Sequence, residues 1–232
     1  AVCNAIQRLR GETFVAILAN GTCGDVFSLD AMKPHKRPTK FFGHAERIAA
    51  VVSAKALWAW NQMEFTSSLK LAAAMEEVTI PRRMPTDKEM EFAKKLMSGE
   101  MNPTNMRHNA WKHFFGPEME EWIRRPTEVK TWVQALAIGN LAAIVGLPGE
   151  IFVEHGLRIK RESPFKYNFV FELANDSLGY VPTVKAFEDD ALSPLEVSGS
   201  YETTIGPNQL VREAGDMMVD SALKMLNVMY KP

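Results

Sequence analysis

The chain has 232 residues and a mass of 26.0 kDa, which suits one ordinary domain or two small ones. Hydrophobic residues make up 46% of it and charged residues 24%, close to the globular average, which argues against disorder and fibrous repeats. The 27 Lys and Arg residues are balanced by 28 Asp and Glu residues, which leaves no basic excess for binding nucleic acid. No apolar run approaches the ~18 residues that a membrane-spanning helix needs.

The first half of the chain predicts helices and strands in alternation. After a short helix end, residues 13–19 (TFVAILA) predict a strand that Asn20-Gly21 ends. Residues 43–63 predict a helix, because apolar residues recur on one expected buried face at Ile48, Val52, Ala56, Ala59 and Met63. Residues 69–80 predict a weaker strand, and a charged helix is expected from about residue 87 to 98.

The second half carries the densest core pattern. A helix is predicted at 117–125, and two buried strands, 131–138 and 141–145, are separated only by Gly139-Asn140. The remaining predicted elements are a helix at 150–162, a strand at 168–173, a loop-rich stretch at 174–207 and a closing helix at 208–229. Strands alternating with helices predict an α/β fold, with a mixed sheet and helices packed on it.

Glu150 follows the turn Leu147-Pro148-Gly149, where the helix predicted at 150–162 is expected to begin. A carboxylate there is stabilised by free amide groups and the helix dipole, which is reason enough for an acid in the first turn. Glu154 and Arg158 would follow on the same face as a salt-bridged ladder. A metal-ligand role for Glu150 is the second interpretation of the same residue.

Tyr180 lies in a polar loop after a predicted strand, where open α/β sheets place ligands. A tyrosine there can donate a hydrogen bond, or ligate a metal if the metal ionises it. It can equally be a residue that packs on the edge of the core with its hydroxyl in water. Tyr201 has the same alternatives.

The histidines alone do not assemble a zinc site. His108 and His113 are five residues apart without a third ligand at a helical interval, and His44 and His155 fall in predicted helices as structural residues. Cys3 and Cys23 are too few for a disulfide framework or a zinc cage, so we expect two small buried thiols. No Gly-x-Ser-x-Gly elbow, phosphate loop or dinucleotide fingerprint occurs.

Five short motifs nevertheless occur in a characteristic order. They are ANGTCGDV at 19–26, LPGE at 147–150, LAN at 173–175, GYVPT at 179–183 and YE at 201–202. Together they resemble the neutral ceramidase family, over about residues 12 to 228, and most of all its bacterial members that have only the catalytic domain. The resemblance implies residues 1–232 to be the C-terminal portion of one such domain, without the C-terminal β-sandwich of full ceramidases.

The resemblance also implies an activity, namely zinc-dependent hydrolysis of N-acyl amide bonds in a lipid-like substrate. Glu150 and Tyr180 match the family's glutamate and tyrosine zinc ligands, and Tyr201 matches a tyrosine that helps to hold the oxyanion. The two histidine ligands are expected upstream of residue 1, in the missing N-terminal half. The chemistry fits, because zinc lowers the pKa of bound water towards ~7 and favours the phenolate form of a tyrosine. A secreted or periplasmic location is compatible with the resemblance.

One position departs from the family pattern. Phe27 stands where the family has a serine assigned to catalysis, and Ser28 follows one residue later. We therefore expect a substrate other than ceramide, with Ser28 as the candidate for the serine's role. The alternative function is a non-catalytic ceramidase-like protein that binds a ligand or serves a structural purpose. Because the first half of the domain is expected elsewhere, this segment should also expose apolar strand surface.

Overall fold

The computed structural model describes residues 1–27, 32, 40–100, 121–191 and 200–231. These residues form two compact units, one built from residues 1–20 and 27–69 and the other from 21–26 and 70–232. No helix in the described ranges is both long and apolar enough to cross a membrane.

The smaller unit is a pair of packed helices. Helix α1 (Val2–Arg10) contacts α2 (Gly43–Trp60), which confirms the helix expected from residue 43. Trp60, at the end of α2, packs edge-to-face with Phe14 at 5.2 Å between ring centroids. The guanidinium of Arg10 lies 4.5 Å from the same indole ring. An aromatic and cation–π cluster therefore joins the two helices at one end.

Two expectations for this unit are wrong. Residues 13–19 form no paired strand in the described structure, and Val15 and Ile17 are exposed. Helix α2 buries only Ala49 and Ser53, whereas the predicted apolar face is largely exposed. Apolar residues that recur at helical spacing predict which side chains share a face of the helix. Burial of that face also needs another element to pack against it, which the spacing does not specify.

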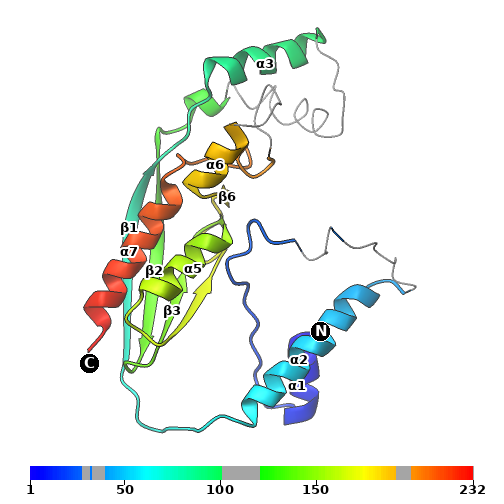
Figure 1. Cartoon of the computed structure of the whole chain (residues 1–232), viewed down its shortest axis with the longest axis vertical. Coiled ribbons are helices and arrows are strands. Elements are labelled where there is room, and N and C mark those ends of the chain that lie inside the picture. The colour runs from blue at the N-terminus through cyan, green and yellow to red at the C-terminus, as the bar shows by residue number, and fades with distance from the viewer. Residues whose placement is uncertain (28–31, 33–39, 101–120, 192–199, 232) are drawn as a thin grey trace. The chain divides into compact units, whose positions relative to one another are not determined.

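The larger unit is built on a four-stranded mixed sheet in the order β1-β2-β3-β5 (Figure 1). Its strands are β1 (Leu71–Pro81), β2 (Glu128–Ile138), β3 (Ala142–Gly146) and β5 (Tyr167–Phe171). The pairs β1/β2 and β2/β3 are antiparallel, and β3/β5 is parallel. The predicted mixed sheet and the tight β2–β3 connection at Gly139-Asn140 are both confirmed.

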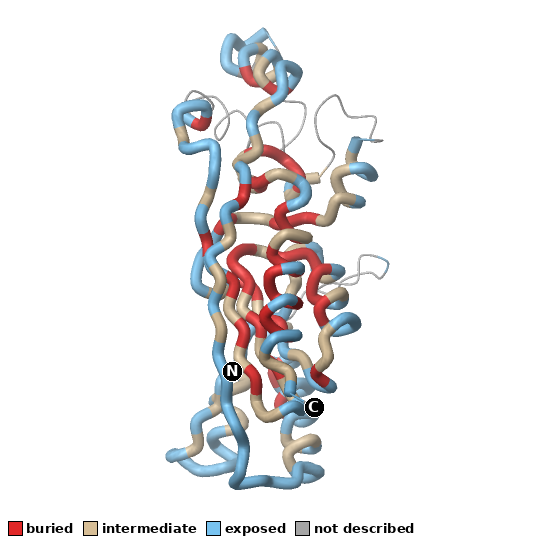
Figure 2. Tube along the Cα trace, turned by 90° about the vertical axis from the view of Figure 1, so that its left-hand side faces the viewer, coloured by how far each residue is buried: buried red, intermediate tan, exposed pale blue. Residues whose placement is uncertain are grey.

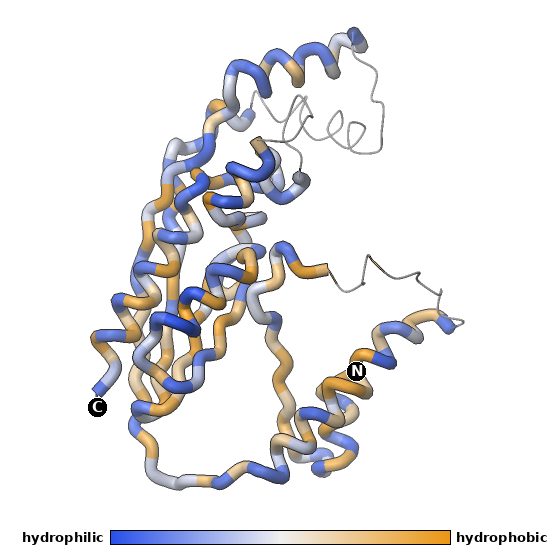
Figure 3. Tube along the Cα trace, viewed as in Figure 1, coloured by the Kyte–Doolittle hydropathy of each residue, from blue (hydrophilic) through white to orange (hydrophobic). Residues whose placement is uncertain are grey.

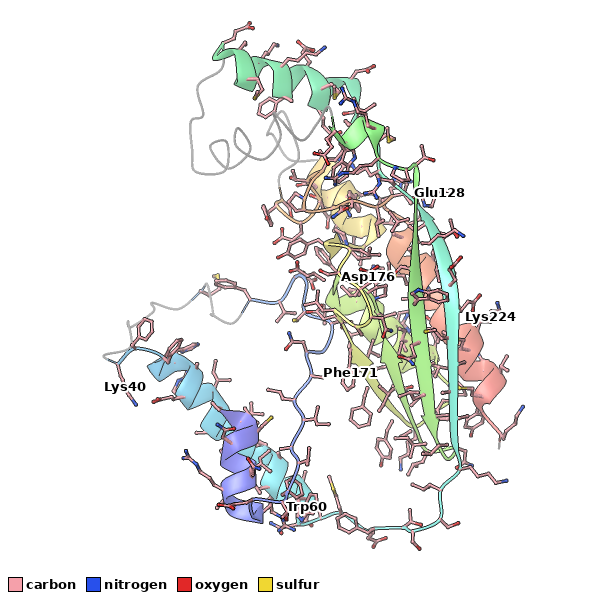
Figure 4. The ribbon with its side chains drawn as sticks, turned by 180° about the vertical axis from the view of Figure 1, so that it is seen from behind. Lys40, Trp60, Glu128, Phe171, Asp176 and Lys224 are labelled. Atoms are coloured by element: carbon pink, nitrogen blue, oxygen red, sulfur yellow. The ribbon has the colours of Figure 1, made fainter. Side chains whose placement is uncertain are left out.

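Helices α5 (Val153–Glu162) and α7 (Ala214–Met229) cover one face of this sheet. Alternate residues of β2 point into that core, with Val133 and Ala135 fully buried, and Met218 and Leu226 of α7 pack against them. Figure 2 shows the buried residues concentrated along the strands and α7, and Figure 3 shows apolar residues recurring there. Lys224 of α7 (labelled in Figure 4) pairs with Glu76 of β1 at 2.8 Å.

The opposite face of the sheet carries apolar side chains that are partly or largely exposed, as expected. Register places Leu136, Ile144 and Phe169 in one row across β2, β3 and β5, and Phe169 is 51% exposed. Trp132 and Met75 add large exposed side chains to this face. Apolar area of this kind is characteristic of a surface that another segment or molecule covers.

The upper end of the unit carries shorter elements. Helix α3 (Asp87–Ser98) begins with a capping box between Thr86 and Glu89, as the predicted start requires. Helix α6 (Val184–Ala191) lies where only a loop was expected. Strands β4 (Glu150–Ile151) and β6 (Tyr180–Val181) form a separate two-stranded sheet.

The helix boundaries differ from prediction at several points. The closing helix α7 begins six residues later than the predicted residue 208, at Ala214. Of the helix predicted at 117–125, residues 121–124 are helical and 117–120 lie outside the described residues.

Candidate active site

Two glycine turns bring Glu150 and Tyr180 side by side. Strand β4 pairs in parallel with β6, and these two residues are opposite each other in the register. Each follows a glycine whose φ lies in the left-handed region, 125° at Gly149 and 73° at Gly179. A Cβ on Gly149 would lie 2.8 Å from the carbonyl oxygen of Gly179, so this close approach requires glycine.

Arg83 joins the two segments that form the other walls of the site. Its guanidinium donates to the carbonyl oxygen of Thr203, two residues after Tyr201, and pairs with Glu89 at 2.6 Å. Its backbone carbonyl oxygen accepts a hydrogen bond of 2.9 Å from the indole N–H of Trp122. One arginine therefore anchors Trp122 and the segment that carries Tyr201.

Glu150, Tyr180 and Tyr201 line one pocket of about 300 Å³. The two tyrosine rings meet edge-to-face, with centroids 5.8 Å apart and planes at 81°. The pocket is completed by Trp122, Arg125, Gly179, Gly206, Pro207 and Gln209. The three residues singled out from the sequence as ligands or oxyanion donor thus come together from three separate segments.

The electrostatics of the pocket keep Tyr180 protonated. Burial is the largest effect that raises the pKa of its hydroxyl, followed by a hydrogen bond to the carboxylate of Glu150. The negative charges of Glu150 and Glu202 raise this pKa further. Without a cation, Tyr180 is therefore a neutral hydrogen-bond donor to the carboxylate of Glu150.

A buried carboxylate, Glu172, supports this site from beneath. It is 7% exposed and accepts hydrogen bonds of 3.0 Å from the backbone N–H groups of Cys23 and Ile151. The thiol of Cys23 also donates to it at 2.8 Å. Burial, and then the interaction with Glu172, raises the pKa of the Cys23 thiol to about 11, so the thiol stays protonated. Glu172 therefore fixes the residue that follows Glu150.

The GTCGD loop at residues 21–25 serves as a structural clamp. The N–H of Gly24 donates to the carbonyl oxygen of Ile151 at 2.9 Å. The carboxylate of Asp25 accepts from the N–H of Val153 at 2.8 Å, which caps α5 from a distant part of the chain. These contacts explain why this motif accompanies the LPGE motif without contributing to the pocket lining itself.

Gly24→Ala should destabilise the larger unit by about 1–3 kcal/mol, because an added Cβ would collide with the backbone carbonyl of Glu150. Gly21→Ala is the matched control in the same loop, since its Cβ would meet only the carbonyl oxygen of Val170 at an ordinary 3.8 Å. Urea unfolding of both variants measures the difference. Equal stability of the two would contradict the close approach of Gly24 to β4.

The sequence interpretation of Glu150 as a first-turn helical acid is wrong. Helix α5 begins at Val153, and Glu150 belongs to a strand because it pairs with Tyr180. The expected ladder along one helix face is wrong too. Arg158 instead forms ion pairs with Glu162, Asp216 and Asp220, two of which lie on α7.

Three other residues named in the sequence analysis are Ser28, Phe27 and His155. Ser28 falls outside the described residues, and Phe27 belongs to the smaller unit, where it is exposed. His155 is buried in α5, with Nε2 3.3 Å from the carbonyl oxygen of Pro182, and burial lowers its pKa. Within the described part of the chain, no three His, Cys, Asp or Glu side chains gather so that they could hold a metal ion.

Sequence reasoning missed Glu172, Trp122 and Arg125. A charged residue ending the apolar run NFVFE was a usable signal for Glu172. Nothing in the local sequence of Trp122 and Arg125 indicates a pocket, because their neighbours there come from residues 150 to 209.

Comparisons with known proteins were made at the levels of sequence and structure. No protein-family model and no curated protein matches the sequence. Among solved structures, the chain is similar to neutral ceramidase from Pseudomonas aeruginosa, with 17% identity and a TM-score of 0.56 over 96% of this chain and 39% of that one. A ceramidase complexed with C2 is similar over 82% of this chain and 36% of that one, with 15% identity and a TM-score of 0.48.

The chain is thus an α/β protein with a mixed sheet, two glycine turns and a carboxylate–tyrosine pocket. Its fold is that of part of a neutral ceramidase, as the motif order predicted. It spans 39% of the length of that ceramidase structure.

Proposed function

We propose that the protein is a zinc-dependent hydrolase of N-acyl amide bonds, acting on a lipid-like substrate other than ceramide. The observation that carries this proposal is the meeting of Glu150, Tyr180 and Tyr201 in one pocket. Each of these residues matches a functional position of the ceramidase family in the order of the sequence motifs. The ceramidase-like fold supports the same class of reaction.

Glu150 and Tyr180 would hold the zinc ion. The hydrogen-bonding proton of Tyr180 marks a place where the oxygens of Tyr180 and Glu150 converge, and carboxylate oxygen is an ordinary zinc ligand. A cation there would replace that proton and favour the phenolate. The resemblance implies two further histidine ligands, which we propose come from a part of the protein that precedes Ala1. A zinc ion so held would polarise the amide carbonyl and lower the pKa of a water molecule towards ~7.

Tyr201 would act on the substrate directly. Its side chain is 45% exposed, and its ring is held edge-on against Tyr180. A hydroxyl in that position can donate to the oxygen of the scissile carbonyl as negative charge develops there. Ser28 remains a proposed further participant.

A second candidate function, a non-catalytic ceramidase-like binding or structural protein, is favoured by one observation. Phe27 occupies the position of the family's serine. A phenyl ring can supply neither a nucleophile nor a proton.

Chelation distinguishes the two functions. The purified full-length protein should release fatty acid from N-acyl amides, lose this activity on dialysis against a zinc chelator, and regain it when zinc is restored. Chelated protein that is returned to a buffer without zinc serves as the control. Absence of turnover by the zinc-loaded protein would favour the binding or structural function.

A further inference from the structure

Besides its acidic residue, the pocket has a basic residue in its lining. Arg125 lines it, and the carbon of its guanidinium lies 4.9 Å from the ring centroid of Trp122. The guanidinium of Arg82 lies 5.5 Å from the same ring. Two cations therefore gather around one indole at the edge of the pocket.

These two charges are only weakly balanced by their contacts. Arg125 pairs with Glu121 at 3.7 Å, beyond ordinary hydrogen-bond length, and the Glu121 side chain is 69% exposed. Such surface pairs contribute little. Arg82 donates to two neutral acceptors, the carbonyl oxygen of Pro126 and the side-chain oxygen of Gln209, both at 3.0 Å. Burial, and then the positive charge of Arg125, lowers the pKa of Arg82.

The acidic residues near Tyr180 are on β4 and on the segment after residue 200. Glu150 and Glu202 both act on Tyr180 through their charge. The pocket thus combines a carboxylate–tyrosine group, which suits a cation, with a guanidinium, which suits an oxyanion and can bind a carboxylate through two parallel hydrogen bonds.

We propose that Arg125 binds a carboxylate on the amine part of the substrate, so that the protein hydrolyses N-acyl amino acids in preference to neutral N-acyl amines. This inference rests on the proposed amidase function and specifies its substrate class. A volume of about 300 Å³ is at the lower limit of small-molecule pockets. It accommodates a small head group around the amide bond and leaves a long acyl chain outside.

Stacking on Trp122 is the competing explanation for Arg125, because a guanidinium can stabilise a turn by packing alone. Arg125→Met separates the two roles, since methionine keeps an unbranched apolar stem beside the indole and removes the charge. Arg124→Met is the matched control: Arg124 is the preceding residue, is exposed, and gives the same change in net charge.

The test compares N-lauroylglycine with N-lauroylethanolamine, which share the acyl chain and the amide. The first compound carries a carboxylate where the second carries a hydroxyl. Zinc-loaded full-length protein should have the higher kcat/KM for N-lauroylglycine. Arg125→Met should lower that value roughly 10- to 100-fold, as expected for a hydrogen bond to a charged group. It should lower kcat/KM for N-lauroylethanolamine far less, and Arg124→Met should change neither value.

Calorimetric titration of N-lauroylglycine into chelated protein gives a readout that is independent of turnover. Binding that is lost in Arg125→Met but kept in Arg124→Met supports the anion site. Such binding without hydrolysis of either amide would refute the proposed function and leave the anion site standing. Hydrolysis of both amides with equal kcat/KM, or equal losses for both in Arg125→Met, would overturn the inference.

Discussion

Glu172→Ala is expected to lower the free energy of unfolding by about 3 kcal/mol, because two backbone N–H groups lose their acceptor at once. Those groups belong to Cys23 and Ile151, and Glu172 itself is 7% exposed, so water cannot readily replace the carboxylate. Each buried donor left without a partner costs about 1–3 kcal/mol. Chemical unfolding of the purified protein measures the loss.

Two comparisons sharpen this result. Glu172→Gln keeps the shape and one acceptor oxygen, so its loss should be smaller, about 1–2 kcal/mol. Glu128→Ala removes an exposed carboxylate at the start of β2 and should change stability by no more than about 0.5 kcal/mol. Similar stabilities for Glu172→Ala and Glu128→Ala would show that Glu172 does not hold β4 to the loop at residues 21–26.

Tyr201→Phe should lower kcat for amide hydrolysis by about 100-fold, the typical effect of removing one oxyanion donor. The phenylalanine ring keeps the edge-to-face packing on Tyr180, whose centroid lies 5.8 Å away, so the fold and zinc content should be unchanged. Steady-state kinetics with metal analysis of the same samples separates these effects.

Tyr167→Phe is the control for this substitution, since Tyr167 is similarly exposed, at 48% against 45% for Tyr201, but lies on β5 outside the pocket. Its kcat should equal that of the wild type. A Tyr201→Phe protein with wild-type kcat would remove Tyr201 from the reaction.

Patterns within one stretch of sequence predicted the fold well. The β2–β3 pair followed from two apolar runs around Gly139-Asn140, and the start of α3 followed from Pro85-Thr86-Asp87 at the expected entry positions. Both features depend on neighbours within a few residues. The strand at residues 13–19 was predicted on the same grounds and does not form, because a strand also needs a partner.

Long-range contacts account for the errors at the site. A Pro-Gly-Glu turn has the composition of a helix start, yet Glu150 pairs with Tyr180, which lies in a strand 30 residues later in the chain. The helix that follows, α5, is capped by Asp25 instead. Arg125 could not have been found from its own surroundings, because the residues opposite it in the pocket are remote in sequence. The motif order groups the two glycine turns with Tyr201, and these segments lie together only in the folded chain.

Zinc content of the full-length protein tests the central claim most directly. Wild type, Glu150→Ala and Glu154→Ala should be purified, exposed to the same zinc concentration, dialysed and assayed for metal, with unfolding curves measured in parallel. Glu154 is the control because it is an exposed carboxylate four residues later, on α5. We predict that Glu154→Ala retains wild-type zinc and that Glu150→Ala, still folded, loses most of it. Equal zinc occupancy in all three proteins would contradict the assignment of Glu150 as a ligand.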